Sequence, residues 1–264
     1  MKKIKKRVNM QYLYYIILGV VSYFIGNFSG ARIVSAFKHK DVTKSGSGNP
    51  GTLNVWRTFG FWPGVMTFLW DMLKGLIPCL VAYLTFNYIG CNSEIALYVA
   101  GFSVVLGHLF PVLYKFKGGK GIATSIGIFL VANWWVALIV FVVMIIGMIF
   151  IKYASIFTIG FVITMSVVEI CLTSPANWVN YIFISLILIL VIYAHRHNIA
   201  KLLTGNENKT ELLAMLKKIA SKKKSSSTEN QDNNAVEVES QNQVNTAVEN
   251  KENDEIKNKD SENK

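Results

Sequence analysis

Long uncharged stretches alternate with short polar or basic segments along most of the chain. Most of these stretches are long enough to cross ~30 Å of hydrocarbon as helices. In lipid only helices and closed barrels satisfy their own backbone polar groups. The pattern predicts an all-α membrane protein, and the stretches cover residues 9–31, 75–93, 95–114, 121–151, 153–168 and 170–194.

Clusters of lysine and arginine between these stretches give the predicted spans a direction. Loops rich in basic residues remain on the cytoplasmic side of a membrane. The connections at 90–94, 132–134 and 173–178 contain no lysine or arginine, so we expect them outside. The basic clusters lie at 32–57, 115–120, 152 and 196–224 and hold 17 lysines and arginines.

Seven helices satisfy this alternation. The run 121–151 must then divide near Asn133, which makes a short helix beginning near Ile122. The five basic residues among residues 1–7 would lie outside, against the usual bias, and we follow the larger set. We therefore expect a bundle of about seven transmembrane helices in the cell (plasma) membrane, with glycine-rich loops and the C-terminus on the cytoplasmic side.

Composition and charge divide the chain into three parts. We expect a polytopic membrane domain over 1–209, a short basic amphipathic segment over 210–224 and a disordered acidic tail over 225–264. The tail holds four lysines and ten acidic residues. The net charge of +11 would suit nucleic acid, but the basic residues flank apolar stretches, where anionic lipid headgroups explain them better.

The three cysteines form no CxxC spacing and lie in or beside apolar stretches. They indicate neither a zinc site nor a disulfide framework. We expect no metal and no cofactor.

The first basic loop, residues 44–57, reads KSGSGNPGTLNVWR. Successive amides in such a glycine-rich loop can point at one anion. The spacing formally matches GxGxxG, but no predicted strand precedes it, which argues against a dinucleotide site. A flexible turn is the alternative, and the polar residues after the glycines favour an anion site instead. The candidate ligands are Gly46, Ser47, Gly48, Asn49, Gly51, Asn54 and Arg57.

The second loop, residues 116–127, reads FKGGKGIATSIG. Its glycines bracket two lysines just before an apolar helix, and free amides at a helix start attract phosphate. Lys120 is followed by Gly121 and not by Ser or Thr, so this is no Walker P-loop. A simple basic turn would explain the lysines but not the glycines. The candidate phosphate ligands are Lys117, Gly118, Gly119, Lys120 and Gly121.

Polar residues after the last span form a third segment. His195 and Asn198 share a face if the helix continues, and together they could orient a reacting group. His197, two residues further on, is a histidine that could be mistaken for the functional one. Within the spans, Asp71 and Lys74 are three residues apart and can pair, either as support beneath a site or as a purely structural ion pair. Glu169, near the outer end of its span, is explained by reaching the interface.

The motifs together resemble the acyl-phosphate-dependent glycerol-3-phosphate acyltransferases, integral membrane enzymes of bacterial phospholipid synthesis. The resemblance extends over nearly the whole span region. It rests on SGSGNPGTLNVWR (45–57), DMLKG (71–75), GHLFPVLYKFKGGKGIATSIG (107–127) and HRHNIAKLLTGNE (195–207). Leu53 stands where the family commonly has threonine, and Lys201 where arginine is usual.

This resemblance implies transfer of an acyl group from acyl phosphate to the first hydroxyl of glycerol 3-phosphate. It implies active-site roles for Ser47, Arg57, His195 and Asn198, binding of glycerol 3-phosphate by the loop 117–121, and a structural role for Glu207. The chain has no HxxxxD, the signature of thioester-using acyltransferases. His195 or the substrate's own phosphate would accept the proton.

The expected partners are acyl phosphate, glycerol 3-phosphate and membrane lipid, with coupling to enzymes that supply acyl phosphate and no nucleic acid. Two other classes of function stay open. A transporter of a phosphorylated metabolite would also use basic loops and an intramembrane ion pair, although no internal repeat is visible. A noncatalytic scaffold would use the acidic tail to bind partners.

Overall fold

The computed structural model describes residues 2–207 and 209–210, and side chains from Met10 onward. These residues belong to the first of two compact units, Met1–Thr210; the second is Glu211–Lys264. The predicted basic segment after residue 210 and the acidic tail lie outside the described residues.

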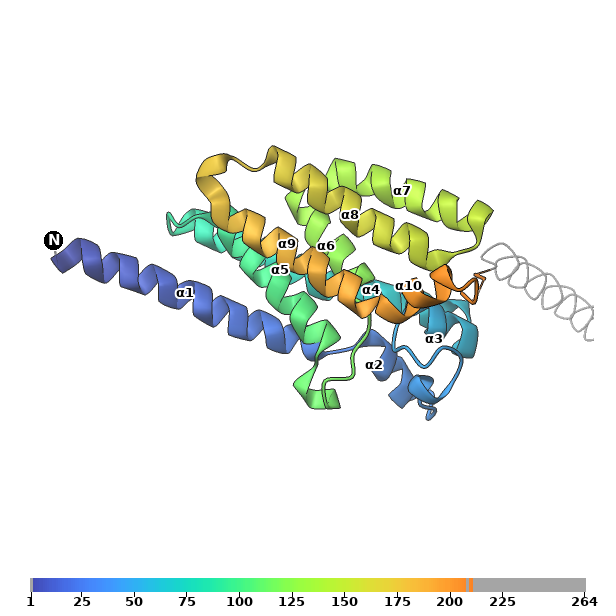
Figure 1. The fold of residues 1–264 in the computed structure, drawn as a ribbon. Helices are drawn as coiled ribbons and strands as arrows, with labels where there is room; N and C mark the ends of the chain where they lie inside the picture. Colours follow the sequence, from blue (N-terminus) through green and yellow to red (C-terminus); the bar gives the residue numbers. More distant parts are fainter. Residues whose placement is uncertain (1, 208, 211–264) are drawn as a thin grey trace, which may run out of the picture. The chain divides into compact units, whose positions relative to one another are not determined.

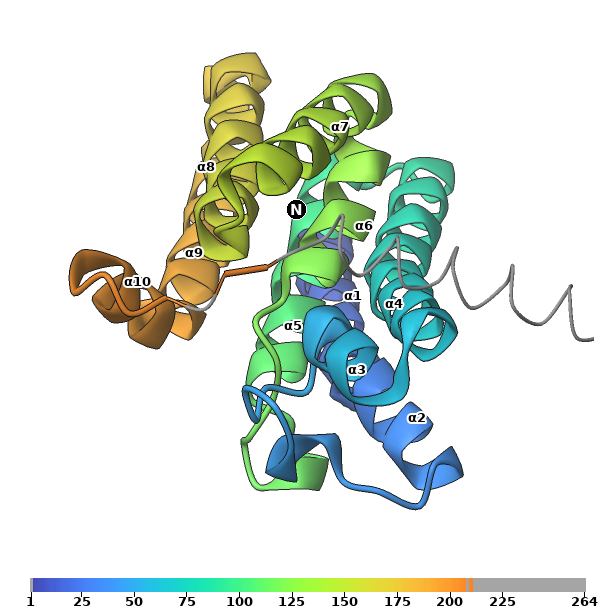
Figure 2. The ribbon, with the colours of Figure 1, turned by 90° about the vertical axis from the view of Figure 1, so that its right-hand side faces the viewer.

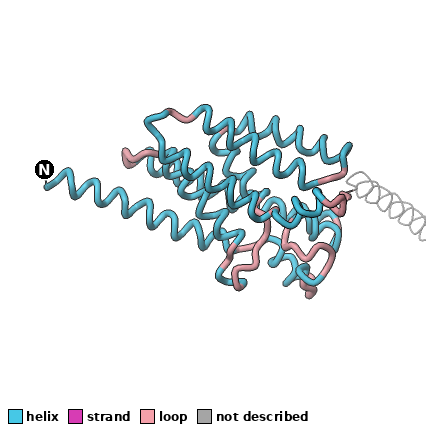
Figure 3. The backbone as a smooth tube through the Cα atoms, in the orientation of Figure 1, coloured by secondary structure: helices cyan, strands magenta, loops and turns pink. Residues whose placement is uncertain are grey.

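The described part of the chain is helical and contains no strand, as Figure 3 makes clear. The α-helices are α1 (Lys2–Asn27), α2 (Gly30–Phe37), α3 (Thr52–Phe59), α4 (Phe61–Tyr88), α5 (Ser93–Leu109), α6 (Ile122–Ala132), α7 (Trp134–Ile151), α8 (Ala154–Leu172), α9 (Trp178–Ala194) and α10 (Arg196–Leu203). Three 3-10 turns join them: η1 (Val42–Lys44), η2 (Val112–Tyr114) and η3 (Pro175–Asn177).

Within the described residues, six stretches are long and apolar enough to cross a membrane. Together with the shorter apolar helix α6 they account for the approximately seven helices expected from the sequence. The predicted division at Asn133 is confirmed, because this residue ends α6 and precedes α7. The prediction of an all-α integral membrane protein is therefore confirmed.

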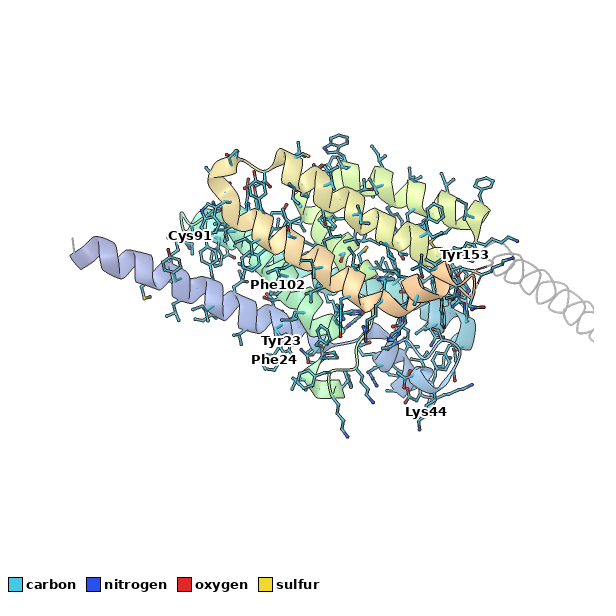
Figure 4. The ribbon with its side chains drawn as sticks, in the orientation of Figure 1. Tyr23, Phe24, Lys44, Cys91, Phe102 and Tyr153 are labelled. Carbon is cyan, nitrogen blue, oxygen red and sulfur yellow. The ribbon has the colours of Figure 1, made fainter. Side chains whose placement is uncertain are left out.

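The helix ends separate into two sets (Figure 1). The turns near residues 90 and 175 lie at one end, and α2, α3 and α10 lie at the other. Figure 4 agrees, with Cys91 at the first end and Lys44 and Tyr153 at the second. We call the second end, formed by α2, α3, α10 and the loop 115–121, the motif face.

The basic segment between the first two long spans contains two short helices. Residues 30–37 and 52–59 form α2 and α3, which were not predicted from the sequence. The reason is a small apolar cluster of Ala31, Val42 and Val55, against which Val34 and Phe59 pack. Burying this cluster stabilises two short helices that local propensity alone does not favour.

Helix α5 is the centre of the bundle and contacts α1, α4, α6 and α9 (Figures 1 and 2). Glycines permit close approaches between helices in this bundle. An added Cβ on Gly107 of α5 would collide with the carbonyl oxygen of Tyr23 in α1, and one on Gly127 of α6 would collide with that of Met72 in α4. Small residues let membrane helices pack backbone against backbone in this way.

We expect Gly107→Ala to destabilise the protein by about 1–3 kcal/mol, because the new methyl group would push α1 away from α5. Gly160→Ala is a matched control, since nothing lies within 4 Å of a Cβ built there. That change should be neutral or stabilising by up to about 1 kcal/mol. Thermal unfolding of both variants in detergent tests this, and equal melting temperatures would contradict the packing argument.

Asp71 and Lys74 form a buried ion pair just beneath the motif face. Lys74 Nζ lies 2.9 Å from Asp71 Oδ1 and donates to the carbonyl oxygens of Gly26 (3.1 Å) and Phe28 (2.9 Å). The backbone N–H of Gly30 donates to Asp71 Oδ1 at 3.2 Å. The pair therefore ties α4 to the junction between α1 and α2.

The interface explanation for Glu169 is wrong. Its side chain is buried between helices, and the hydroxyl of Tyr98 in α5 donates to Glu169 Oε2 at 2.7 Å. A polar partner on a neighbouring helix holds this carboxyl group inside the bundle.

Candidate functional site

The first glycine-rich loop is shaped by Asn54, which lies on α3. The Oδ1 of Asn54 accepts from the backbone N–H of Ser47 at 2.9 Å, and its Nδ2 donates to the carbonyl oxygens of Val42 and Ser45, both at 3.0 Å. Gly46 has φ +58° and a Cβ there would collide with Asn54 Oδ1, so only glycine suits the position. The side-chain amide of Asn54 is therefore used in hydrogen bonds within the loop, whereas the sequence had indicated that it would bind phosphate directly.

Polar groups of this loop and of α3 remain available at the motif face. Ser47 has an exposed side chain and Asn49 is half-buried. Gly51 caps the start of α3, and no side chain satisfies the first amides of that helix. Arg57 follows one and a half turns later, and its Nη2 donates to Thr210 Oγ1 at 2.8 Å.

The glycine–lysine loop folds back on the end of α5. The amides of Gly118 and Gly119 donate to the carbonyl oxygens of Leu109 (3.1 Å) and His108 (3.2 Å). A Cβ on Gly118 or Gly119 would collide with His108, and one on Gly119 would lie 3.1 Å from the carbonyl oxygen of Pro50. The two glycine-rich loops therefore touch, and glycine is required where they meet.

The start of α6 offers unused hydrogen-bond donors. Gly121 has φ +82° and turns the chain into this helix. No side chain caps the helix, and within the described residues no acceptor meets the amides of Ile122, Ala123 and Thr124. The hydroxyl of Thr124 is also buried without a partner. Free amides at a helix start are suited to an anion.

Lys120 directly precedes these amides. Burial lowers its pKa to about 8, and the neighbouring Arg57 and Lys201 lower it while Glu207 opposes the shift. The ammonium group is therefore still charged at neutral pH, with limited solvation of its own. Such a group gains much from a phosphate partner. The second lysine of the loop, Lys117, is exposed, and its carbonyl oxygen accepts from Arg32.

His195 joins α9 to α10 and is only 1% exposed. The helical hydrogen bonding continues through it, because Ile199 N–H donates to His195 O at 2.9 Å. Its Nδ1 lies 2.8 Å from the carbonyl oxygen of Val191. A carbonyl only accepts, so Nδ1 carries the proton and Nε2 presents a lone pair. Burial lowers the pKa of His195 to about 4, which keeps the ring neutral at pH 7.

Glu207 connects the three segments. Its Oε1 accepts from Asn198 Nδ2 at 2.9 Å and from Ser155 Oγ at 2.7 Å. Its carboxyl group also interacts electrostatically with Arg57, Lys120 and His195. The residues from three distant parts of the sequence therefore surround one carboxylate.

Sequence reasoning missed two members of this arrangement. Ser155 lies in the first turn of α8 and donates to Glu207, and Thr210 meets Arg57 and donates its N–H to Lys152 O at 2.6 Å. A polar residue at the motif-face end of an apolar helix was the available signal for Ser155. Nothing local distinguishes Thr210. His197, the histidine that could be mistaken for the functional one, is exposed.

The arrangement has the features of a site for phosphate groups. Two cations, Lys120 and Arg57, face a single carboxylate, and bare amides and a neutral imidazole lie beside them. A phosphate dianion bound there would gain charge-assisted hydrogen bonds in a partly desolvated setting.

Comparison with known proteins gives matches to one family. Residues 16–205 match the family described as glycerol-3-phosphate acyltransferase. The glycerol-3-phosphate acyltransferase of Finegoldia magna is 40% identical over 201 residues, which cover 76% of this chain and 98% of the relative. That of Clostridioides difficile is 38% identical, with 76% and 97% covered.

A solved structure has the same fold. The crystal structure of PlsY, an integral membrane glycerol 3-phosphate acyltransferase, in its glycerol 3-phosphate form gives a TM-score of 0.69 at 34% identity and covers 77% of this chain and 98% of that one. Its lysophosphatidic acid form gives 0.68 at the same identity. By sequence and by fold, then, the chain belongs to the glycerol-3-phosphate acyltransferase family.

Proposed function

We propose that the protein transfers a fatty acyl group from acyl phosphate to the sn-1 hydroxyl of glycerol 3-phosphate. The products would be 1-acyl-glycerol 3-phosphate (lysophosphatidic acid) and inorganic phosphate, in the first step of phospholipid synthesis. The observation that carries this proposal is the gathering of Arg57, Lys120 and His195 around Glu207, beside the bare amides of α6. Both proposed substrates bear phosphate, and the site is rich in cations and hydrogen-bond donors that can bind phosphate.

Each candidate residue then has a task. Lys120 and the free amides that follow it at the start of α6 bind the phosphate of glycerol 3-phosphate, while the side chains of Ser47 and Arg57 bind the acyl phosphate. The amides of Gly118, Gly119 and Ser47 already donate within the protein and shape the two loops. Asn198, held by Glu207, keeps the third segment in position. Because acyl phosphate is already activated, positioning and charge stabilisation suffice and no protein nucleophile is needed.

The proposed reaction is a direct attack. The sn-1 oxygen bonds to the acyl carbon, the bond from that carbon to the phosphate oxygen breaks, and the hydroxyl proton ends on the departing phosphate. His195 accepts a hydrogen bond from the attacking hydroxyl through Nε2, which Nδ1–H bonding to Val191 leaves free. With a pKa of about 4, the imidazole orients this hydroxyl well but retains a proton poorly at pH 7.

We expect His195→Ala to lower kcat by about 10²-fold, the low end of what a positioned acid–base group contributes, because the imidazole orients the hydroxyl without keeping its proton. His195→Gln should recover part of this loss, because its amide oxygen can accept the same hydrogen bond. His197→Ala is the matched control, since that side chain is exposed two residues away. Steady-state rates of purified protein test this, and unchanged turnover in His195→Ala would exclude the role.

The assay for the whole proposal uses detergent-purified protein with palmitoyl phosphate and labelled glycerol 3-phosphate. Acyl carrier protein and coenzyme A thioesters serve as comparison donors. We expect lysophosphatidic acid with the acyl phosphate alone. Product formed equally well from a thioester would reject the donor, and no product from any donor in folded protein would reject the function.

We further propose that the motif face lies on the cytoplasmic side of the plasma membrane. The basic clusters at 32–57, 115–120 and 196–224 favour this orientation. An active site there would receive glycerol 3-phosphate from the cytoplasm. Acyl phosphate is a reactive mixed anhydride, so coupling to the enzyme that supplies it would limit its loss to water.

A further inference from the structure

A basic recess lies on the motif face, and its lining contains none of the residues around Glu207. Its volume is about 510 Å³. One wall of the recess is α2, which Figure 2 shows, and the opposite wall is Tyr114 of the η2 turn. The lining residues are Arg32, Ser35, Ala36, His39, Lys40, Asp41 and Tyr114.

Two contacts hold the Arg32 side chain in this recess. Its guanidinium stacks on the ring of Tyr114, 4.3 Å from the centroid, and its Nη2 donates to Lys117 O at 3.1 Å. Among the described residues, the guanidinium makes no other hydrogen bond, so donors remain beyond the one that Nη2 uses. A guanidinium with donors to spare is suited to a phosphate oxygen.

The charge of the recess favours an anion. Arg32 and Lys40 outnumber Asp41, whose Oδ1 already accepts from the N–H (2.9 Å) and hydroxyl (2.7 Å) of Thr43. Further exposed lysines lie close by in the chain, in the segment from the end of α2 through η1 and in the loop after η2. They are Lys38, Lys44, Lys115 and Lys117.

The position of the recess indicates where the anion comes from. The candidate spans Met10–Phe37 and Ser93–Tyr114 both end at it, so it lies at the level of lipid headgroups. Its two walls also carry exposed apolar side chains: Phe37 is 81% exposed, Leu113 56% and Phe116 60%. Basic groups beside apolar ones at a span end are suited to the membrane interface.

We propose that this recess binds the phosphate headgroup of an anionic phospholipid from the adjacent leaflet, as a site separate from that of the reacting substrates. The guanidinium group of Arg32 would bind the phosphate from its accessible side, Lys40 would contribute a second charge, and the apolar side chains would meet the acyl chains. Since Arg32 also holds Lys117 O, the bound lipid lies directly beside the glycine–lysine loop.

The test measures retained lipid by native mass spectrometry of the full-length protein from nanodiscs of phosphatidylcholine and phosphatidylglycerol. We expect selective retention of phosphatidylglycerol, weakened about fivefold by Arg32→Gln and by Lys40→Gln, as for the loss of one cation near an anionic surface. Lys38→Gln is the matched control, because Lys38 is an exposed lysine that does not line the recess.

Three outcomes would overturn the proposal. An equal loss in Lys38→Gln would mean diffuse surface attraction, and equal retention of phosphatidylcholine would mean no charge selection. Displacement of phosphatidylglycerol by millimolar inorganic phosphate would make the recess a site for soluble phosphate. Lys40 is exposed, so Lys40→Gln decides the matter even if Arg32→Gln fails to fold.

Discussion

Replacing Lys120 with methionine is expected to lower kcat/KM for glycerol 3-phosphate by about 10²- to 10³-fold. The ammonium group is partly buried beside the unpaired amides of α6, so its loss removes a desolvated charge from the proposed phosphate site. Methionine retains the length and the apolar character of the side chain. Initial rates over a range of glycerol 3-phosphate concentrations measure the effect.

Lys115→Met is the matched control for this change, because Lys115 is an exposed lysine of the same segment. Its kcat/KM should stay within about twofold of the parent, as for most exposed charges. Similar losses in the two variants would mean that net charge, and not the position of Lys120, governs the activity.

The pH dependence of the activity tests separately whether the charge of Lys120 is needed. Because its pKa is lowered to about 8, the cation is lost as the pH rises through 8 in the substrate-free protein. The value of kcat/KM, which reports on free enzyme, should therefore fall above about pH 8. Lys120→Arg should remove this alkaline decline whatever its absolute rate, since arginine stays protonated. An unchanged decline would assign it to another group.

Asp71→Ala is expected to cost about 3–5 kcal/mol of stability, because it leaves the Lys74 ammonium buried without its counterion. For a unit of this size the melting temperature should fall by roughly 6–20 °C. Thermal unfolding in detergent measures this. Asp71 lies beneath the site around Glu207 and is not part of it. The molecules of the variant that remain folded at low temperature should therefore still be active.

The double variant Asp71→Leu with Lys74→Met is the control for this argument. Replacing both charges by apolar side chains of similar size removes the desolvation cost, so much of the lost stability should return. A double variant no more stable than Asp71→Ala would show that Lys74 stabilises chiefly through its bonds to Gly26 and Phe28.

The spans and the three motif segments could be predicted from the sequence because both depend on local composition. Apolar runs have the length of the bilayer, and Asn133 stands as a polar break inside the longest of them. Glycine-rich basic loops beside helix starts likewise indicate anion sites, and the whole signal lies within a few consecutive residues. The step to one particular reaction rested on resemblance to a family.

The partners of individual side chains could not be predicted in the same way. Asn54 serves as the internal clamp of its loop, since three backbone groups of the folded loop converge on it. Glu169 is buried because Tyr98, on another helix, meets its carboxyl group. Helix α2 forms because its apolar face covers Val42 and Val55, which follow it in the chain.

The sequence alone therefore determined the membrane-spanning helical class, the division at Asn133 and the three segments that bear the candidate chemistry, since periodicity, span length and glycine content are local properties. Only the tertiary structure decided which groups meet. It brings Thr210 to Arg57 across 153 residues and Ser155 to Glu207 across 52. Such contacts depend on how the helices pack, and the packing is set by many weak contacts that no single segment contains.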